Sequence, residues 1–104
     1  MNNSNDFTYD KVKYAGLPAF VDKLHSEGMH YMVLLDPGVS AGEKPGEYPP
    51  FDRGVELDIF IKNSTKQPFI GKTWNKISTA YPDFTHPSAT AYWTEMMTSL
   101  HQQV

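Results

Sequence analysis

The chain has 104 residues, of which 39% are hydrophobic and 20% are charged. These values are ordinary for a globular protein and allow at most one small domain, which excludes a multi-domain machine. There is no cysteine, so disulfides and thiolate metal sites are excluded together. The net charge is −3 and the lysines and arginines form no cluster, so we expect no nucleic-acid partner.

The longest apolar run covers residues 31–35, far short of the roughly 20 residues needed to cross a bilayer. We therefore expect no membrane insertion by this segment. The first six residues, Met-Asn-Asn-Ser-Asn-Asp, lack the basic start and the apolar middle of a signal peptide. Any secretory signal is expected to lie elsewhere.

A helix is the first element that the pattern predicts. Four apolar residues recur at the spacing of one helix face: Leu17, Phe20, Val21 and Leu24. Pro18 falls in the first turn and Gly28 follows the last apolar position, as is usual at helix starts and ends. The sequence therefore predicts a helix over residues 17–28 with one buried face.

Residues 30–35 form a short apolar run without alternation, which ends at Asp36-Pro37-Gly38. Such runs are typical of strands that are covered on both faces, and these strands belong to parallel sheets. A helix that leads into such a strand predicts one unit of an α/β fold.

Residues 36–54 contain four prolines and four glycines, which predict an irregular loop of unusual length. Apolar residues then alternate over 57–62, and a second β-like run covers 69–74. These two runs predict a hairpin. We therefore expect residues 36–74 to form one long loop and hairpin excursion.

The last predicted element is an amphipathic helix. Its apolar residues keep helical spacing to the end of the chain: Ala89, Tyr92, Trp93, Met96, Met97, Leu100 and Val104. Residues 85–88 carry capping side chains and Pro87 ahead of it. Trp93 lies on the apolar stripe, so we expect it in the core.

These elements supply only one parallel strand, and one strand cannot make a parallel sheet. The strand and the helices would leave apolar surfaces uncovered. We therefore interpret residues 1–104 as a single incomplete domain, a piece of a larger α/β domain.

Asp36 is the first candidate for chemistry, because it stands where the predicted strand gives way to a loop. α/β barrels and open sheets gather their active sites at that edge. The alternative is that Asp36 only makes a turn with Pro37 and Gly38. Three other residues could supply a second carboxylate for acid and base catalysis: Asp52, Asp58 and Asp83.

Trp74 ends the irregular segment 71–74, which offers it no helical partner. An exposed indole is a good platform for the apolar face of a sugar ring or for a base. The alternative is that Trp74 packs against the predicted hairpin.

Other motifs carry less weight. The four histidines show no metal-binding spacing: His25, His30, His86 and His101. Ser40 stands in a G-x-S-x-G pattern, but prolines follow where the helix of a nucleophile elbow would have to begin. Asn2 and Asn63 begin N-glycosylation sequons, which also arise by chance.

Taken together, the motifs resemble the catalytic domain of glycoside hydrolase family 31, the group of lysosomal α-glucosidase, maltase-glucoamylase and sucrase-isomaltase. The match runs nearly end to end, and its carriers keep one order along the chain. They are Asp6-Phe7-Thr8-Tyr9-Asp10, Leu17-Pro18-Ala19-Phe20-Val21, Leu24-His25 with Gly28, residues 31–37, Tyr48, Asp52-Arg53-Gly54, Phe69-Ile70-Gly71-Lys72 with Trp74, Tyr81-Pro82-Asp83-Phe84-Thr85 with Pro87, Tyr92-Trp93 and residues 100–104.

The resemblance implies a partial (β/α)8 TIM barrel: early strand-helix units, with residues 31–36 as the third strand. It also implies a retaining α-glucosidase that hydrolyses terminal α-linked glucose through two carboxyl groups. The family's nucleophile stands in a Trp-Ile-Asp-Met-Asn-Glu motif beyond the position of Val104, and its acid follows later. The family's sugar-binding aspartate, on the strand that precedes the third strand, would lie before Met1. We therefore expect no catalytic residue in this chain, and a truncated gene or partial open reading frame as its origin.

The resemblance implies that Leu34, Asp36 and Trp74 bind substrate as part of the wall of the glucose pocket. Asn75-Lys76 follow Trp74 where the family usually has Pro-Gly, which affects how Trp74 is aimed. No cofactor and no metal are implied. The implied partners are a maltose-like oligosaccharide and the rest of the barrel.

Family members work in the secretory pathway, in lysosomes, at cell surfaces and outside cells, so the resemblance gives only a broad location. The isolated chain is expected to be inactive. One alternative is a non-catalytic carbohydrate-binding or interaction fragment. Another is an unstable remnant that exposes the apolar face of its last helix.

Overall fold

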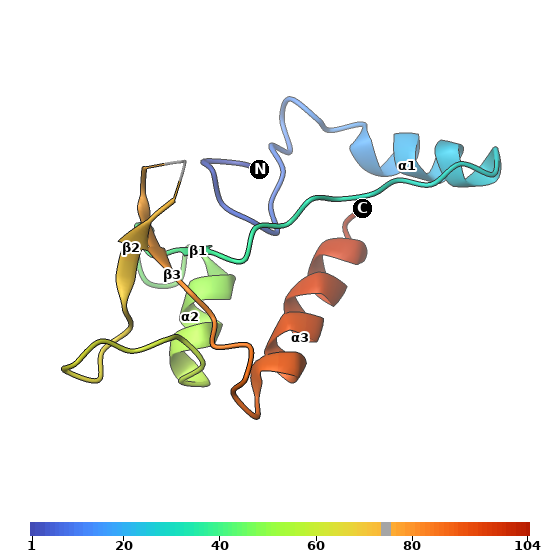
Figure 1. Cartoon of the computed structure of the whole chain (residues 1–104). Coiled ribbons are helices and arrows are strands. Elements are labelled where there is room, and N and C mark those ends of the chain that lie inside the picture. The colour runs from blue at the N-terminus through green and yellow to red at the C-terminus, as the bar shows by residue number, and fades with distance from the viewer. Residues whose placement is uncertain (74–75) are drawn as a thin grey trace.

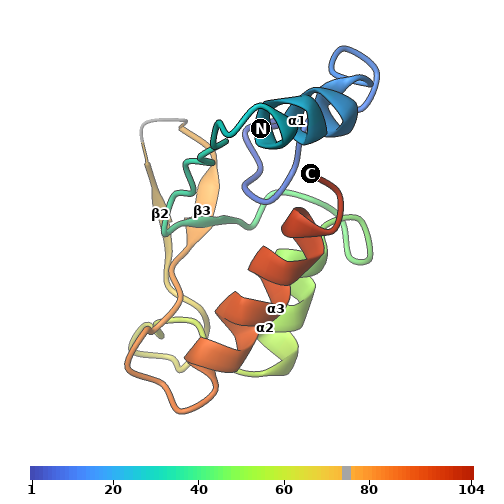
Figure 2. The ribbon, with the colours of Figure 1, turned by 90° about the vertical axis from the view of Figure 1, so that its right-hand side faces the viewer.

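The computed structural model describes residues 1–73 and 76–104, and Figures 1 and 2 show it from two sides. The elements follow one another as α1 (Leu17–Ser26), β1 (Val39–Ser40), α2 (Pro49–Glu56), β2 (Ile70–Lys72), β3 (Ser78–Ala80) and α3 (Ala89–His101). The strands form one antiparallel sheet in the order β1-β3-β2. The parallel sheet expected from the sequence does not form within the described residues.

The core lies where α2 and α3 pack side by side next to the sheet (Figures 1 and 2). Tyr92 of α3 is fully buried, and its hydroxyl donates to the carbonyl oxygen of Pro50 in α2 at 2.6 Å. The ring of Phe60 stacks on Phe51 at 5.5 Å and meets Tyr92 edge-on at 6.5 Å. The buried cluster consists of Phe7, Val39, Tyr48, Ile59, Phe60, Ala80, Tyr92, Met96 and Leu100.

Trp93 lies at the edge of this cluster. Its ring meets Phe7 edge-on at 5.1 Å and Phe84 edge-on at 5.2 Å. The side chain is only partly buried, but it packs against the core, as the apolar stripe of the last helix predicted.

The first predicted helix is confirmed as α1. It ends in a Schellman motif: Gly28 has a φ of 76°, the N–H of Met29 donates to Leu24, and the N–H of Gly28 donates to His25. Its predicted buried face is confirmed in part, because Val21 is buried and Leu17 and Leu24 are partly buried, while Phe20 is 55% exposed. Little of the rest of the chain covers α1.

The prediction of a covered strand at 30–35 is also wrong for this chain. Residues 30–35 are extended but belong to no ladder of the described structure. The apolar side chains of residues 31–34 are exposed, with Met32 and Leu34 at 85% each, whereas Leu35 is partly buried against the core. A strand needs neighbours on its edges and cover on its faces, and the described part of the chain supplies neither.

The loop predicted at 36–54 is wrong in its second half, because α2 begins at Pro49. Pro49 and Pro50 occupy the first turn of α2, where an N–H has no helical acceptor and the fixed φ of proline fits the helix. The prolines therefore start a helix here rather than prevent one. Within the first half, Val39 and Ser40 form β1.

The hairpin predicted between 57–62 and 69–74 forms only next to its turn, where Lys62 bridges Pro68 and the N–H of Phe69 donates to the carbonyl oxygen of Ile61 at 2.7 Å. Beyond that point β2 pairs with β3, with Gly71 opposite Thr79. The 57–62 segment contributes only the isolated bridges Phe60–Pro82 and Lys62–Pro68. Strand pairing depends on contacts far apart in sequence, which alternation alone does not specify.

The final helix is confirmed as α3, but its predicted capping is not. Ser88 occupies the N-cap position and makes no side-chain bond to the helix. The turn before α3 is held by Asp83, whose carboxylate accepts from the N–H and the hydroxyl of Thr85. Asp83 therefore orders the approach to the helix rather than its first turn.

The molecule is extended for its length. Its radius of gyration is 15.1 Å and its extents are 51 × 28 × 24 Å, whereas a compact domain of this length has a radius of gyration of about 13 Å. In Figures 1 and 2, α1 stands apart from the layer of α2 and α3. Among the described residues, no helix has the length and apolar character needed to cross a membrane.

Gly54 provides a test of the core. An added Cβ there would lie 2.6 Å from Cε2 of Phe60. Overpacking of this kind costs about 1–3 kcal/mol, which outweighs the gain in helix propensity of at most about 1 kcal/mol. We expect Gly54→Ala to lower the free energy of unfolding in urea by about 1 kcal/mol.

The matched control is Gly42→Ala. Gly42 is exposed and a Cβ there would meet nothing closer than 4.0 Å. This substitution should change the free energy of unfolding by less than about 0.5 kcal/mol. Equal effects of the two substitutions would show that Phe60 does not pack tightly against α2.

Candidate functional site

Two of the three predicted pocket residues lie within the described structure. Leu34 is 85% exposed at the end of the extended segment, and Asp36 follows it, partly buried. Trp74 lies outside the described residues, so its role stays a prediction. Leu34 and Asp36 are brought together with a residue that the sequence did not single out, Asp6.

Asp6 connects three segments that lie far apart in the sequence. Its Oδ2 accepts the backbone N–H of Asp36 at 2.8 Å. Its backbone oxygen accepts the hydroxyl of Tyr48, just before α2, at 3.0 Å. Asp6 is only 3% exposed, so both bonds are shielded from water. The N-terminal loop is thereby fixed against the end of the 31–35 segment.

Asp6 and Leu34 also line one small cavity of about 90 Å³. Its walls come from the N-terminal loop, the 31–35 segment and the last residues of the chain. The lining residues are Met1, Asp6, Phe7, Thr8, Tyr9, Leu17, Tyr31, Val33, Leu34, Leu35, Leu100 and Val104. Asp6 therefore borders the same cavity as Leu34 and is bonded to Asp36.

The surroundings of Asp6 disfavour its charge. Its pKa is raised to about 6, chiefly by burial and next by the nearby Asp36 carboxylate. The N–H bond from Asp36 and the N-terminal ammonium group act in the opposite direction, but they are weaker. Within the described structure, Oδ1 of Asp6 and Oδ1 of Asn5 are buried without a hydrogen-bond partner. Two acceptors without a donor favour a proton on Asp6.

Tyr48 completes this environment as a neutral donor. Burial raises the pKa of its hydroxyl well above the ordinary value, and Asp6 adds to that shift. The phenol therefore keeps its proton and can donate to the backbone oxygen of Asp6 throughout the physiological range. On the other side, the amide Nδ2 of Asn5 donates to Oε1 of Glu43 at 2.9 Å.

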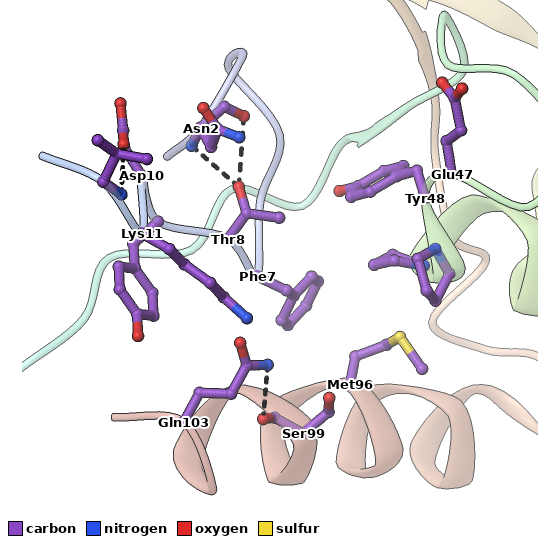
Figure 3. Close-up of a pocket in the computed structure, with 14 residues that line it drawn as sticks. Asn2, Phe7, Thr8, Asp10, Lys11, Glu47, Tyr48, Met96, Ser99 and Gln103 are labelled. Atoms are coloured by element: carbon purple, nitrogen blue, oxygen red, sulfur yellow. Dashed lines mark hydrogen bonds between the residues drawn. The ribbon is translucent and has the colours of Figure 1, made fainter. Parts of the chain in front are cut away.

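A larger cavity of about 560 Å³ lies between the N-terminal loop, the start of α2 and α3. Figure 3 shows Phe7 and Met96 pointing into it with Tyr48 opposite, and Lys11 and Gln103 near one end. It combines an apolar wall with polar groups at the rim, which suits binding more than bond cleavage. Neither Leu34 nor Asp36 lines it.

The remaining carboxylates proposed for catalysis have local partners. Oδ2 of Asp52 accepts the N–H of Gly46 at 3.0 Å. Asp58 is paired with Lys62. Asp83 accepts two bonds from Thr85, and these lower its pKa. Each of the three carboxylates thus has a role in holding a turn or an ion pair.

Ser40 and the histidines show no catalytic or metal-binding arrangement. Ser40 is buried in β1 opposite Thr79, and its hydroxyl oxygen accepts the N–H of Gly42. It therefore does not stand on the exposed strand-to-helix turn that a nucleophile needs. In residues 1–73 and 76–104, no group of three histidines or carboxylates is placed to hold a metal ion.

The comparisons with known proteins agree with the resemblance in the sequence. Residues 1–104 match the glycosyl hydrolases family 31 TIM-barrel domain. The chain belongs to glycosyl hydrolase family 31. The hydrolase class expected from the resemblance is thereby confirmed at the level of the family.

Named relatives of this family 31 chain include two alpha-glucosidases and a sucrase-isomaltase. It is 40% identical over 104 residues to lysosomal alpha-glucosidase of Mus musculus and 38% identical over 107 residues to intestinal sucrase-isomaltase of Homo sapiens. It is 40% identical over 95 residues to the alpha-glucosidase of Mucor javanicus. The alignments cover 100%, 100% and 89% of the chain, but only 11%, 6% and 10% of the relatives.

Sequence reasoning on this family 31 chain missed Asp6. The residue stands in one of the motifs that carry the resemblance, Asp6-Phe7-Thr8-Tyr9-Asp10, but nothing in the motif assigns it a role. An aspartate beside a buried phenylalanine was the available signal, because a buried carboxylate requires a partner. That partner lies 30 residues away along the chain.

The raised pKa of Asp6 makes the stability of the chain depend on pH. The folded state binds the proton more tightly than the unfolded state, because the pKa is about 6 in one and near the ordinary 3.8 in the other. The resulting stabilisation is fully present below the ordinary pKa and is lost as the pH rises through about 6. We expect the melting temperature to fall over this range.

Asp6→Asn should reduce this pH dependence and should raise the melting temperature near neutral pH, because asparagine is neutral and keeps the acceptor oxygen for Asp36. The control is Asp10→Asn, since the Asp10 carboxylate accepts N–H bonds from Val12 and Lys13 and pairs with the ammonium group of Lys13 at 3.9 Å, without a bond to Asp36. Melting curves of both variants, recorded between pH 4 and 7, give the melting temperature and its dependence on pH. An unchanged slope for Asp6→Asn would contradict the assignment.

Proposed function

We propose that the chain is part of the catalytic barrel of a retaining α-glucosidase that removes terminal glucose from maltose-like oligosaccharides. In this proposal Leu34, Asp36 and Trp74 form part of the wall of the pocket that binds the terminal sugar. The chain spans about a tenth or less of the relatives named above, so the rest of the barrel is its necessary partner. The catalytic carboxyl groups belong to that remainder.

The alternating exposure of the extended segment carries the proposal. Met32 and Leu34 are each 85% exposed, whereas Tyr31 and Val33 are 39% and 41% exposed. Tyr31, Val33 and Leu35, together with Met32, line a hollow of about 650 Å³ between α1 and α3. One face of the segment, with Tyr31 and Val33, is therefore better covered than the other face, with Met32 and Leu34.

A strand of a (β/α)8 barrel has these two faces. Its outward side chains pack on the surrounding helices, and its inward side chains fill the barrel. The alternation supports residues 31–35 as such a strand seen without its neighbours. Leu34 would then point inward near the carboxyl end of the strand, and Asp36 would follow at the face where barrels of this kind bind substrate.

The three residues offer the chemistry that a glucose pocket uses for binding. Leu34 contributes an apolar surface, and Asp36 contributes a carboxylate that can accept hydroxyl groups of a sugar. The indole of Trp74 offers a flat face for the C–H groups of the ring. Retaining hydrolysis also needs a nucleophile and an acid about 5 Å apart, which these residues do not provide.

We therefore expect the purified 104-residue chain to release no product from an aryl α-glucoside above the level of a chain carrying Asp36→Asn, measured by absorbance. The reading frame of the transcript beyond Val104 should encode the Trp-Ile-Asp-Met-Asn-Glu motif that carries the family's nucleophile.

Turnover that Asp36→Asn abolishes would contradict the proposal, because the catalytic groups would then lie within the chain. A continued reading frame without an aspartate in the expected motif would contradict it as well. A protein carrying the motif should hydrolyse the same substrate, and should lose most of that activity when the aspartate of the motif is replaced.

A further inference from the structure

Asp6 stands out among the groups that the proposed pocket wall does not include. It is bonded to the backbone of Asp36 at 2.8 Å, and it lines the same small cavity as Leu34. It therefore contacts Asp36 directly and borders the same cavity as Leu34. Its own side chain is almost entirely buried, so it has no direct access to a ligand in this structure.

We infer that Asp6 is a positioning residue for the proposed sugar-binding wall, and that it acts through the backbone of Asp36. The bond to Asp36 fixes the chain where the extended segment ends and turns into Pro37 and Gly38. The bond from Tyr48 to the backbone of Asp6 anchors this contact on the start of α2. The functional meaning rests on the proposed function, whereas the contact itself does not.

The contact is sensitive to charge because two carboxyl groups lie close together in it. The titratable groups that face Asp6 are Asp36, Tyr48, the N-terminal ammonium group and, through Asn5 and Tyr48, Glu43, while Tyr9 and Tyr31 line the shared cavity. The ammonium group is the one cation among these described neighbours, and its influence is the weakest of those acting on Asp6. Ionised Asp6 therefore repels the carboxylate of Asp36.

Protonation of Asp6 removes this repulsion and keeps the bond to the backbone. The neutral carboxyl group still accepts the N–H of Asp36 through one oxygen, and its other oxygen gains a proton to donate. Protonation also removes the buried negative charge next to Oδ1 of Asp6, which has no hydrogen-bond donor in the described structure. The wall should thus be best ordered when Asp6 is neutral, and should loosen as the pH rises through about 6.

The test follows the Asp36 amide by NMR in the 104-residue chain labelled with ¹⁵N and ¹³C. We expect the amide shift of Asp36 to change with pH at the same midpoint as the carboxyl carbon of Asp6, near 6. In Asp6→Asn this change should disappear. In Asp10→Asn, which alters a carboxylate of the same loop without a bond to Asp36, it should persist.

Maltose titrations of the same three chains test whether the bond between Asp6 and Asp36 affects sugar binding by the proposed pocket wall. The dissociation constant of the unmodified chain and of Asp10→Asn should be a few-fold larger at pH 7 than at pH 5. For Asp6→Asn it should be the same at both values and close to that of the unmodified chain at pH 5. A merely structural role for Asp6 would alter stability without producing this pattern.

The outcomes separate this inference from the proposed function. The inference is overturned if the amide shift of Asp36 does not change as Asp6 titrates. It is also overturned if the dissociation constant of maltose is the same at both pH values. If the amide follows Asp6 but maltose does not bind at either pH, the positioning contact is supported and the isolated chain is no sugar-binding fragment, whereas the proposed function is decided by the reading frame beyond Val104. The titration of the unmodified chain decides the contact even if Asp6→Asn does not fold.

Discussion

The burial of Tyr92 is the interaction on which the ordered part of the structure depends. Its ring lies between α2 and α3 and next to Phe60, and its hydroxyl closes the contact by donating to Pro50. The ring removes a large apolar surface from water and leaves no unpaired hydroxyl behind. Phe60, which packs on this ring, is buried and Trp93 beside it is partly buried, whereas α1 and residues 31–34 remain largely exposed.

The elements that could be predicted are those whose signals are local. α1 and α3 follow from apolar spacing, and Gly28 marks the end of α1 because a left-handed residue is needed there. α2 was missed because proline density suggests loops, although proline fits the first turn of a helix. The pairing of β2 with β3 could not be obtained from alternation, since it depends on which distant segment approaches.

The residues of the candidate site also differ in whether a local sequence signal predicts them. Leu34 and Asp36 were reached through the family motifs and through the position of an aspartate after an apolar run. Asp6 was not, because its importance comes from burial and from a bond across 30 residues. Neither the burial of Asp6 nor its distant hydrogen-bond partner can be inferred from a local sequence pattern. A motif indicates that a residue is important, and the three-dimensional structure shows which residue it contacts.

The bare segment at residues 31–35 has a consequence for how such a chain behaves in solution. Its backbone N–H and carbonyl groups meet no ladder partner in the described structure, and its most exposed side chains are apolar. An open edge of this kind is a template for pairing with any other extended polypeptide. Solubility on expression, capture by chaperones and attack by proteases are therefore governed by this one stretch until neighbouring strands close over it.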